Sequence, residues 1–179
     1  DLLADDGTPL GASDVFRRAR DGERTGDALV LRVAWLFGHD KPSFPDRILR
    51  QALERLDISA VNDKWSSPTY ADDVGEWLMA LLRTPGARGL FHLCNTGVCS
   101  WQEYGEETLA IAARMGLPVK TTRVRGHTME GFAPFLAERP PYTPLDTALF
   151  TATTGVQPRS WQSALEDYLH THYQNKELP

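Results

Sequence analysis

The chain has 179 residues, which is enough for one domain of ordinary size or two small ones. Its 24 acidic and 19 basic side chains give a formal net charge of −5, which disfavours a nucleic-acid-binding protein because such proteins need a basic face. Hydrophobic residues make up 41% of the chain, enough for a core, but they form no run long enough to cross a membrane.

The N-terminal third is predicted to pass from an irregular segment into a strand and then a helix. Residues 1–27 are polar and rich in Gly, Asp and Arg, so we expect an irregular lead-in with at most a short helix near Ser13–Arg20. The segment Ala28–Phe37 is almost wholly apolar, which is typical of a strand buried on both faces in a parallel sheet. Apolar residues at helical spacing then predict a helix over 45–56, followed by a short strand over 57–61.

The middle of the chain continues this alternation. A helix is predicted over 70–82 and a strand over 89–94. Ser100 and Glu103 have the spacing of a capping box, in which each side chain accepts a hydrogen bond from the backbone amide of the other residue. This pattern begins a third helix, which Gly116 is expected to end. Strands that alternate with helices in this way predict an α/β fold with a parallel sheet.

The C-terminal part has weaker strand signals and one clear helix. Val119–Val124 alternates weakly, which favours a further strand, and residues 126–145 are predicted to form a long loop that contains prolines. Asp146 can cap a short helix. Ser160 is predicted to cap the last helix, whose apolar stripe consists of Trp161, Ala164, Leu165, Tyr168 and Leu169. Residues 174–179 are expected to be a frayed tail.

Sequence motifs for catalysis, cofactor binding or metal binding are mostly absent. The sequence contains no glycine-rich dinucleotide turn, no P-loop, no H-E-x-x-H and no G-x-S-x-G. The five histidines are scattered, and His170 and His172 are two residues apart on a predicted helix, so they should point to different faces. We therefore predict no metal site.

The cysteines and the paired carboxylates also favour structural roles. Cys94 ends an apolar strand and is interpreted as a small core residue. Together with Cys99 it makes only two cysteines, too few for a disulfide scaffold, which favours a reducing, cytoplasmic setting. Asp72 and Asp73 are neighbours on a helix and do not face each other, so we interpret them as solvated or first-turn charges.

Two residues have positions that suit ligand binding. Trp35 lies near the carboxyl end of the most apolar strand, where ligands of open α/β sheets bind. Its indole could pack on a sugar ring, or it could be an ordinary core side chain. Arg139 lies in a loop among prolines and aromatic residues, where its planar guanidinium could bind a diphosphate through two hydrogen bonds or could simply lie at the surface.

Five segments occur in an order that is typical of one enzyme family. They are Arg32-Val-Ala-Trp-Leu-Phe-Gly38, the stretch from Val61 to Asp73, Gly89–Cys94 together with Ser100-Trp101, Arg139-Pro-Pro-Tyr-Thr-Pro-Leu-Asp146, and Trp161-Gln-Ser-Ala-Leu165. In turn they resemble R-T-S-W-V-Y-G, V-D-D-Q-x-G-S-P-T-x-A-x-D, G-x-Y-H-L with S-W-x-E-F-A, R-P-x-Y-S-V-L-D and W-x-x-A-L. These are motifs of the dTDP-4-dehydrorhamnose reductases, and the resemblance covers most of the chain.

The resemblance implies the extended short-chain dehydrogenase fold. In that fold a Rossmann-like parallel sheet is interleaved with a small α/β substrate-binding domain, here called RmlD-like. This chain would contain only the C-terminal part, with the last sheet strands and most of the substrate-binding domain together over 28–173. In such enzymes NADPH or NADH reduces the 4-keto group of a dTDP-4-dehydro-6-deoxyhexose, a step of dTDP-rhamnose biosynthesis.

The resemblance also assigns residues and exposes departures from the family pattern. By position, Trp35 would line the sugar pocket, Arg139 would contact the diphosphate and Tyr142 would lie near the nucleotide. The catalytic Tyr-x3-Lys pair of the family should fall within residues 9–23, which contain neither a tyrosine nor a lysine, and Phe37 stands where the family has a tyrosine. No catalytic or cofactor-binding residue is therefore predicted, and NADPH or NADH is expected only in a full-length parent.

Three functions follow from this pattern. The chain is interpreted first as the nucleotide-sugar-binding part of a reductase. It could instead be a non-catalytic, degenerate paralogue that acts as a binding or regulatory module, or part of a related nucleotide-sugar epimerase or dehydratase. The expected partner is a dTDP-sugar or another nucleotide sugar, with no nucleic acid and no membrane. Strands 28–37 and 89–94 would expose sheet edges, so we also expect a homo-oligomer or aggregation of the isolated chain.

Overall fold

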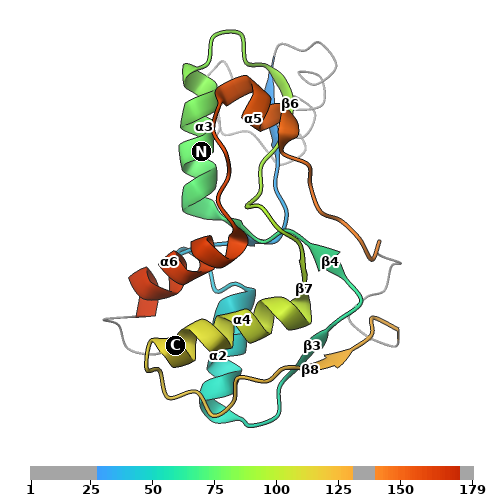
Figure 1. Cartoon of the computed structure of the whole chain (residues 1–179), viewed down its shortest axis with the longest axis vertical. Helices are drawn as coiled ribbons and strands as arrows, with labels where there is room; N and C mark the ends of the chain where they lie inside the picture. The colour runs from blue at the N-terminus through green and yellow to red at the C-terminus, as the bar shows by residue number, and fades with distance from the viewer. Residues whose placement is uncertain (1–27, 131–139, 174–179) are drawn as a thin grey trace, which may run out of the picture.

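The computed structural model describes residues 28–130 and 140–173, and these form an elongated α/β molecule (Figure 1). The fold therefore agrees with the α/β class that the alternating pattern predicts. The predicted lead-in over 1–27 and the predicted tail over 174–179 lie outside the described residues. Within the described ranges no helix combines the length and the apolar character that a membrane span requires.

One end of the molecule is built on a parallel strand pair (Figure 1, top). Strand β1 (Leu29–Arg32) pairs in parallel with β6 (Gly89–His92), as expected for the last strands of a parallel sheet. Helices α3 (Ala71–Arg83) and α5 (Ala148–Thr154) pack against each other, and α5 also contacts β6. The buried residues at this end are Trp77, Leu81, Phe91, Leu93 and Phe150.

The other end is a helical layer (Figure 1, bottom). Helix α4 (Trp101–Arg114) contacts both α2 (Phe44–Glu54) and α6 (Trp161–Tyr173). The predicted apolar stripe of the last helix is confirmed, because all five of its members are buried: Trp161, Ala164, Leu165, Tyr168 and Leu169. These side chains form one core cluster with Phe37, Leu49, Tyr70 and Tyr104.

The other six described strands are short. They form three pairs, namely β2 (Leu36–Phe37) with β5 (Thr69–Tyr70), β3 (Ser59–Val61) with β8 (Arg125–His127), and β4 (Trp65–Ser66) with β7 (Cys99–Ser100). Among them, β3 and β8 lie at the lower end beside α4 (Figure 1). The first two pairs are parallel and the third is antiparallel. The described residues thus contain four separate strand pairs rather than one continuous sheet.

The prediction of one unbroken strand over Ala28–Phe37 is wrong. β1 ends at Arg32 and β2 begins at Leu36, and Trp35 between them has a φ of 41°. A residue with positive φ cannot continue a pleated strand, so the chain turns at this point. The carbonyl of Trp35 accepts a hydrogen bond from the amide of Thr69 (3.2 Å), which supports the turn from the neighbouring segment. Apolar composition indicates burial but does not reveal such a turn.

The prediction of a strand over Val119–Val124 is also wrong. The strand at this place is β8, which begins at Arg125 and extends into the segment 126–145 that is predicted to be a loop. Backbone bonds to β3 decide its position, since the amide of Arg125 donates to the carbonyl of Ile58 (2.8 Å) and that of Asn62 to His127 (2.9 Å). The pairing partner therefore decides where the strand lies, and local alternation does not.

The predicted helix ends are largely confirmed. The amide of Ser100 donates to the carboxylate of Glu103 (2.7 Å), and the amide of Glu103 donates to the Ser100 hydroxyl (3.1 Å), which is the predicted capping box. Gly116 follows α4 with a φ of 80°, a conformation that favours glycine. Asp146 accepts from the amide of Ala148 (2.8 Å) at the start of α5, although Thr147 occupies the capping position itself.

Candidate functional site

The turn at Trp35 lies beside a pocket at the carboxyl end of β1. The pocket has a volume of about 240 Å³, and its aromatic lining consists of Trp35, Phe37, Phe44, Trp101 and Tyr104. The Trp35 ring lies 5.6 Å from Trp101 and 6.3 Å from Tyr104, measured between ring centroids. Trp35 is only partly buried, so the same side chain packs on the core and faces the pocket.

The remaining lining of this pocket is partly apolar, with Leu36, Pro42 and Pro45, and partly polar. Arg47 and Ser43 contribute a cation and a hydroxyl from the start of α2. Flat aromatic faces suit the apolar face of a sugar or base ring, and a guanidinium suits an anionic group. The pocket can therefore bind a ligand that combines a ring with negative charge.

Tyr142 lies on a segment that runs beside β4. The amide of Trp65 donates to the carbonyl of Pro141 (2.7 Å), and the amide of Thr143 donates to the carbonyl of Trp65 (2.9 Å). Tyr142 thus lies opposite Trp65 in a parallel bridge, and the residue is 66% exposed. Arg139, the third predicted site residue, lies outside the described residues.

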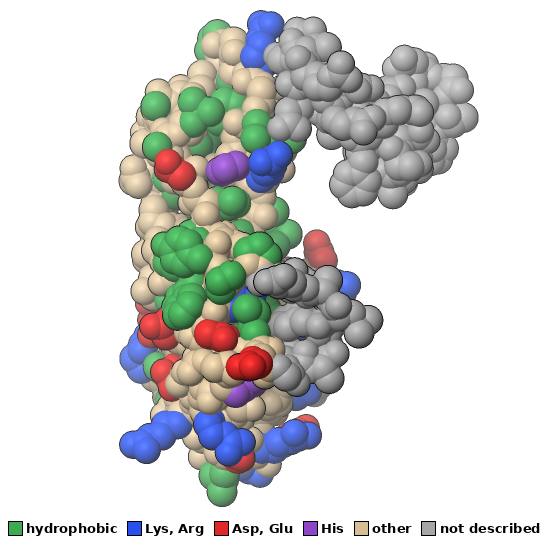
Figure 2. Space-filling model, turned by 90° about the vertical axis from the view of Figure 1, so that its right-hand side faces the viewer, with side chains coloured by type: hydrophobic (Ala, Val, Ile, Leu, Met, Phe, Trp, Pro, Cys, Tyr) green, Lys and Arg blue, Asp and Glu red, His purple; other side chains and the backbone are tan. Residues whose placement is uncertain are grey.

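The structure connects Trp35 and Tyr142 through shared neighbours. β4, which carries the Tyr142 segment, pairs on its other side with β7, and β7 leads directly into Trp101 of the aromatic pocket. Figure 2 shows the molecule from the side on which β4 lies in Figure 1, and hydrophobic side chains gather along the middle of this face. The two predicted residues therefore belong to one region of the molecule.

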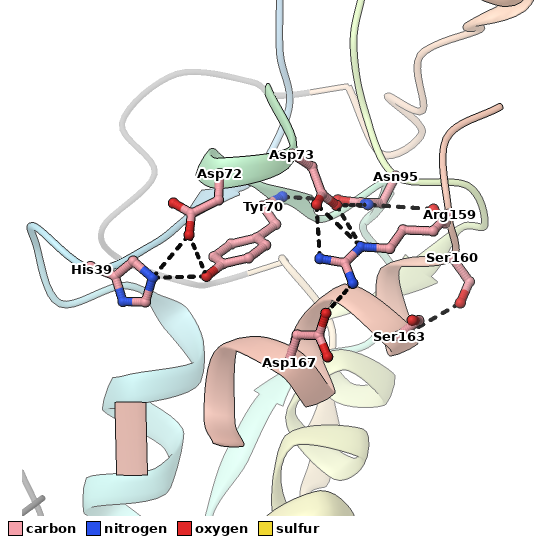
Figure 3. Close-up of polar contacts among 9 residues, drawn as sticks. All are labelled: His39, Tyr70, Asp72, Asp73, Asn95, Arg159, Ser160, Ser163 and Asp167. Carbon is pink, nitrogen blue, oxygen red and sulfur yellow. Dashed lines mark hydrogen bonds and ion pairs between the residues drawn. The ribbon is translucent and has the colours of Figure 1, made fainter. Parts of the chain in front are cut away.

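A polar cluster that no sequence motif predicted lies at the start of α3 (Figure 3). Asp73 is buried and accepts hydrogen bonds from Arg159 through Nε (3.0 Å) and Nη2 (2.8 Å), and from Asn95 Nδ2 (2.6 Å). The side chain of Asn95 in turn accepts from the amide of Tyr70 (2.9 Å). Arg159 also pairs with Asp167. Its hydrogen bond with Asp73 raises the pKa of the guanidinium further above its usual range.

Of the two alternatives for Asp73, the solvated charge is therefore wrong, whereas the first-turn charge is confirmed, because Asp73 lies in the first turn of α3. Asp73 joins the start of α3 to the end of β6 and to the segment that enters α6, so the cluster holds three elements together. No local pattern pairs Asp73 with Arg159, because the two residues are 86 positions apart. Asp72, by contrast, is exposed, as predicted.

Asp72 belongs to a second, partly exposed cluster with His39 and Tyr70 (Figure 3). His39 Nε2 lies 2.8 Å from the Tyr70 hydroxyl and 3.2 Å from Asp72 Oδ2, and its Nδ1 lies 2.7 Å from Nδ1 of His172. Burial and the hydrogen bond to Asp72 raise the pKa of Tyr70, so its hydroxyl stays protonated and donates to Asp72 (2.8 Å). Among the described residues no group of three His, Cys, Asp or Glu side chains is placed to hold a metal.

The cysteines lie in the interior. Cys94 and Cys99 are both buried and free, and burial raises the pKa of each thiol. The interpretation of Cys94 as a small core residue is confirmed. A thiol with a raised pKa is a poor nucleophile, which is consistent with a packing role.

The surroundings of Asp46, at the start of α2 beside the pocket, lead us to expect that the folded protein loses stability at low pH. Burial alone would raise its pKa, but hydrogen bonds from Ser43, Tyr168 and Tyr173 outweigh burial and lower the pKa below its ordinary value of 3.8. This stabilisation is therefore present above pH 4 or so and is lost as the pH falls through the lower pKa of the folded state. We expect Asp46→Asn to flatten the fall of unfolding free energy below about pH 4, measured by urea titration.

The same substitution at Asp40, which is exposed, is the matched control and should leave this acid dependence unchanged. An identical acid dependence in Asp46→Asn and the wild type would contradict the assignment to Asp46.

Comparisons with known proteins extend over most of the chain. Residues 21–174 match the family model described as the RmlD substrate binding domain. The chain is 31% identical over 167 residues to the spore coat polysaccharide biosynthesis protein SpsK of Bacillus subtilis. This match covers 90% of this chain and 56% of that protein. It is 31% identical over 171 residues to the dTDP-4-dehydrorhamnose reductase of Streptomyces griseus, covering 89% of this chain and 54% of that protein.

Solved structures give the same picture. The dTDP-4-dehydrorhamnose reductase from Bacillus anthracis, solved in complex with NADP, superposes with a TM-score of 0.70 at 29% identity, over 80% of this chain and 48% of that one. The UDP-N-acetylglucosamine 4-epimerase from Bacillus cereus superposes with a TM-score of 0.64 at 17% identity, over 93% of this chain and 59% of that one, which indicates a shared fold only. The chain spans about half the length of the curated relatives it matches.

Proposed function

Since the chain belongs to the RmlD substrate binding domain family, we propose that it forms the nucleotide-sugar-binding part of an NAD(P)H-dependent reductase of the dTDP-4-dehydrorhamnose reductase type. The proposed substrate is a dTDP-4-dehydro-6-deoxyhexose. The observation that carries the proposal is the aromatic pocket around Trp35, at the strand end where ligands of such sheets bind. Residues 28–173 would act as one unit in this role.

Three residues are proposed to contact the substrate. The Trp35 indole packs against the apolar face of the sugar ring, with Trp101 and Tyr104 behind it. Tyr142 lies near the nucleotide, which suits an exposed ring on a segment fixed to β4. Arg139 contacts the diphosphate, a role that rests on its place in the family motif and on the geometry of a guanidinium.

The described residues do not fit a nicotinamide dinucleotide. A pyrophosphate cradle needs a glycine-rich turn at the carboxyl end of a strand. Gly86 and Gly89 have positive φ angles of 79° and 92°, but both lie at the amino end of β6. We therefore derive no step through NADPH or NADH, and propose that the whole protein binds it with residues outside the described part.

The proposal is tested by calorimetric titration of dTDP and dTDP-glucose into the whole protein that contains this chain. We expect both to bind, and UDP-glucose to bind at least about tenfold more weakly, because thymine and the 2′-deoxyribose differ from uracil and ribose at the contact surface. Absence of dTDP binding at millimolar concentration would contradict the proposal.

A second candidate is a non-catalytic binding module. It is favoured by the sequence of residues 9–23, which lacks the tyrosine and lysine of the family's catalytic pair. The two candidates differ in one assay, the oxidation of NADPH with a dTDP-4-dehydro-6-deoxyhexose. Binding of dTDP without oxidation of NADPH would favour the binding module, whereas oxidation of NADPH would favour the reductase.

A further inference from the structure

Strand β4 is paired along both of its edges. On one edge it pairs with β7, with Trp65 opposite Ser100 and Ser66 opposite Cys99. On the other edge lies the segment 140–143, which includes Tyr142. The middle strand of this three-stranded arrangement therefore determines where Tyr142 lies relative to the aromatic pocket.

Backbone and side-chain hydrogen bonds both hold the segment. Three consecutive residues of the chain, Lys64, Trp65 and Ser66, all donate to it. The Lys64 ammonium donates to the carbonyl of Pro140 (2.7 Å), the Trp65 amide donates to Pro141 (2.7 Å), and the Ser66 hydroxyl donates to Thr143 (3.0 Å).

Lys64 is an unusual residue at such a place. It is only 7% exposed, although lysine is almost never fully buried without partners. The Pro140 carbonyl is one partner of its ammonium, and a hydrogen bond from a charged donor is stronger than one from a neutral donor. The long, buried side chain of Lys64 thus places its positive charge beside Pro140, the first residue of the segment 140–143.

Lys64 and Ser66 both depart from the family motif that this stretch resembles. In the motif V-D-D-Q-x-G-S-P-T, to which Val61–Thr69 corresponds, the positions of Lys64 and Ser66 carry Gln and Gly. Glycine has no hydroxyl, so the bond from Ser66 to Thr143 depends on the residue found here.

We propose that Lys64 is a positioning residue, which fixes the segment 140–143 on β4 and thereby holds Tyr142 in place for the nucleotide. This inference rests on the proposed function of the same site. Lys64 itself does not contact the ligand, because it is buried beneath the segment that carries Tyr142. The predicted consequence is a loss of affinity without a loss of catalytic rate.

The test replaces Lys64 in the whole protein and measures two quantities. Lys64→Met keeps the length of the side chain and removes the charge and the donor. We expect its Kd for dTDP to rise about tenfold, and KM to rise equally while kcat changes by less than about twofold. Amide hydrogen exchange at Thr143, whose amide is bonded to Trp65, should become faster even without ligand. Lys64→Arg, which keeps a cationic donor, should restore most of the affinity.

The control is Lys120→Met, because Lys120 also donates to a backbone carbonyl, that of Glu54 (2.9 Å), which belongs to the end of α2 and not to the segment 140–143. It should leave Kd and the exchange at Thr143 unchanged. Faster exchange in Lys64→Met with unaltered dTDP affinity would overturn the inference, as would equal exchange in Lys64→Met and the wild type. Failure of the wild type to bind dTDP would instead overturn the proposed function, and the exchange measurement would still test the role of Lys64.

Discussion

Asp73→Ala is expected to destabilise the protein by about 3 kcal/mol or more, because it leaves the guanidinium of Arg159 partly buried without its main partner. Asp73 is the acceptor for two nitrogens of Arg159 and for the amide of Asn95. Removing one member of a buried ion pair typically costs about 3–5 kcal/mol. The lower end applies because the Arg159 side chain is 34% exposed and keeps Asp167 as a partner. Urea unfolding measures this change directly.

The matched control is Asp57→Ala. Asp57 also forms an ion pair with an arginine, Arg125 (3.3 Å), but both side chains are at least 70% exposed. Exposed pairs of this kind contribute about 1 kcal/mol or less. Equal losses of unfolding free energy in Asp73→Ala and Asp57→Ala would show that burial does not determine how much the ion pair between Asp73 and Arg159 stabilises the protein. The double variant Asp73→Ala with Arg159→Met should regain part of the loss, since it removes the unpaired charge.

Trp35→Ala is expected to weaken the binding of dTDP-sugars by at least about tenfold, because a tryptophan that contacts a ligand commonly dominates the binding energy. The indole supplies one wall of the pocket and lies within ring-contact distance of Trp101 and Tyr104. Calorimetric titration of dTDP-glucose measures the change. The affinity for dTDP alone should fall less than that for dTDP-glucose, since Trp35 is proposed to contact the sugar.

The variant Trp35→Gly distinguishes the contribution of the indole from that of the backbone conformation at this position. A φ of 41° destabilises the folded state by roughly 1 kcal/mol or more when the residue has a Cβ atom. Glycine has no Cβ atom and adopts this conformation without that penalty. Trp35→Gly should therefore be about 1 kcal/mol more stable than Trp35→Ala, while both variants lose the ligand contact equally. The opposite order of stability would contradict the left-handed turn, and unchanged affinity in both variants would remove Trp35 from the site.

The family assignment follows from the amino-acid sequence alone. The ordered motifs between Arg32 and Leu165 indicate the dTDP-4-dehydrorhamnose reductase family, and the match of residues 21–174 to its substrate binding domain confirms it. The assignment of Tyr142 to the site follows from the same motifs. Its role, like those of Trp35 and Arg139, stays a prediction until ligand binding is measured.

Local signals are sufficient for the helices. The capping box of Ser100 and Glu103 and the apolar stripe of α6 are both predicted correctly. Both depend on residues a few positions apart, since a helix closes its hydrogen bonds over four residues. The parallel pairing of β1 with β6 agrees with the predicted parallel sheet, although two helices, α2 and α3, lie between these strands in the chain.

Long-range contacts decide the rest. The first strand breaks at Trp35, whose carbonyl accepts a hydrogen bond from the distant Thr69. Asp73 bonds to Arg159, and His39 contacts His172. In each case the two residues are near each other only in the folded chain. The place of Tyr142 beside β4 depends in the same way on Lys64 and Ser66, whose bonded partners lie 76 and 77 positions away. Helix periodicity and caps are properties of neighbouring residues, so the sequence alone determines them. Distant groups in the folded chain decide three other features, because they satisfy the hydrogen bonds of the backbone and of buried charges: the burial of a charge, a turn within an apolar run and the register of a short strand.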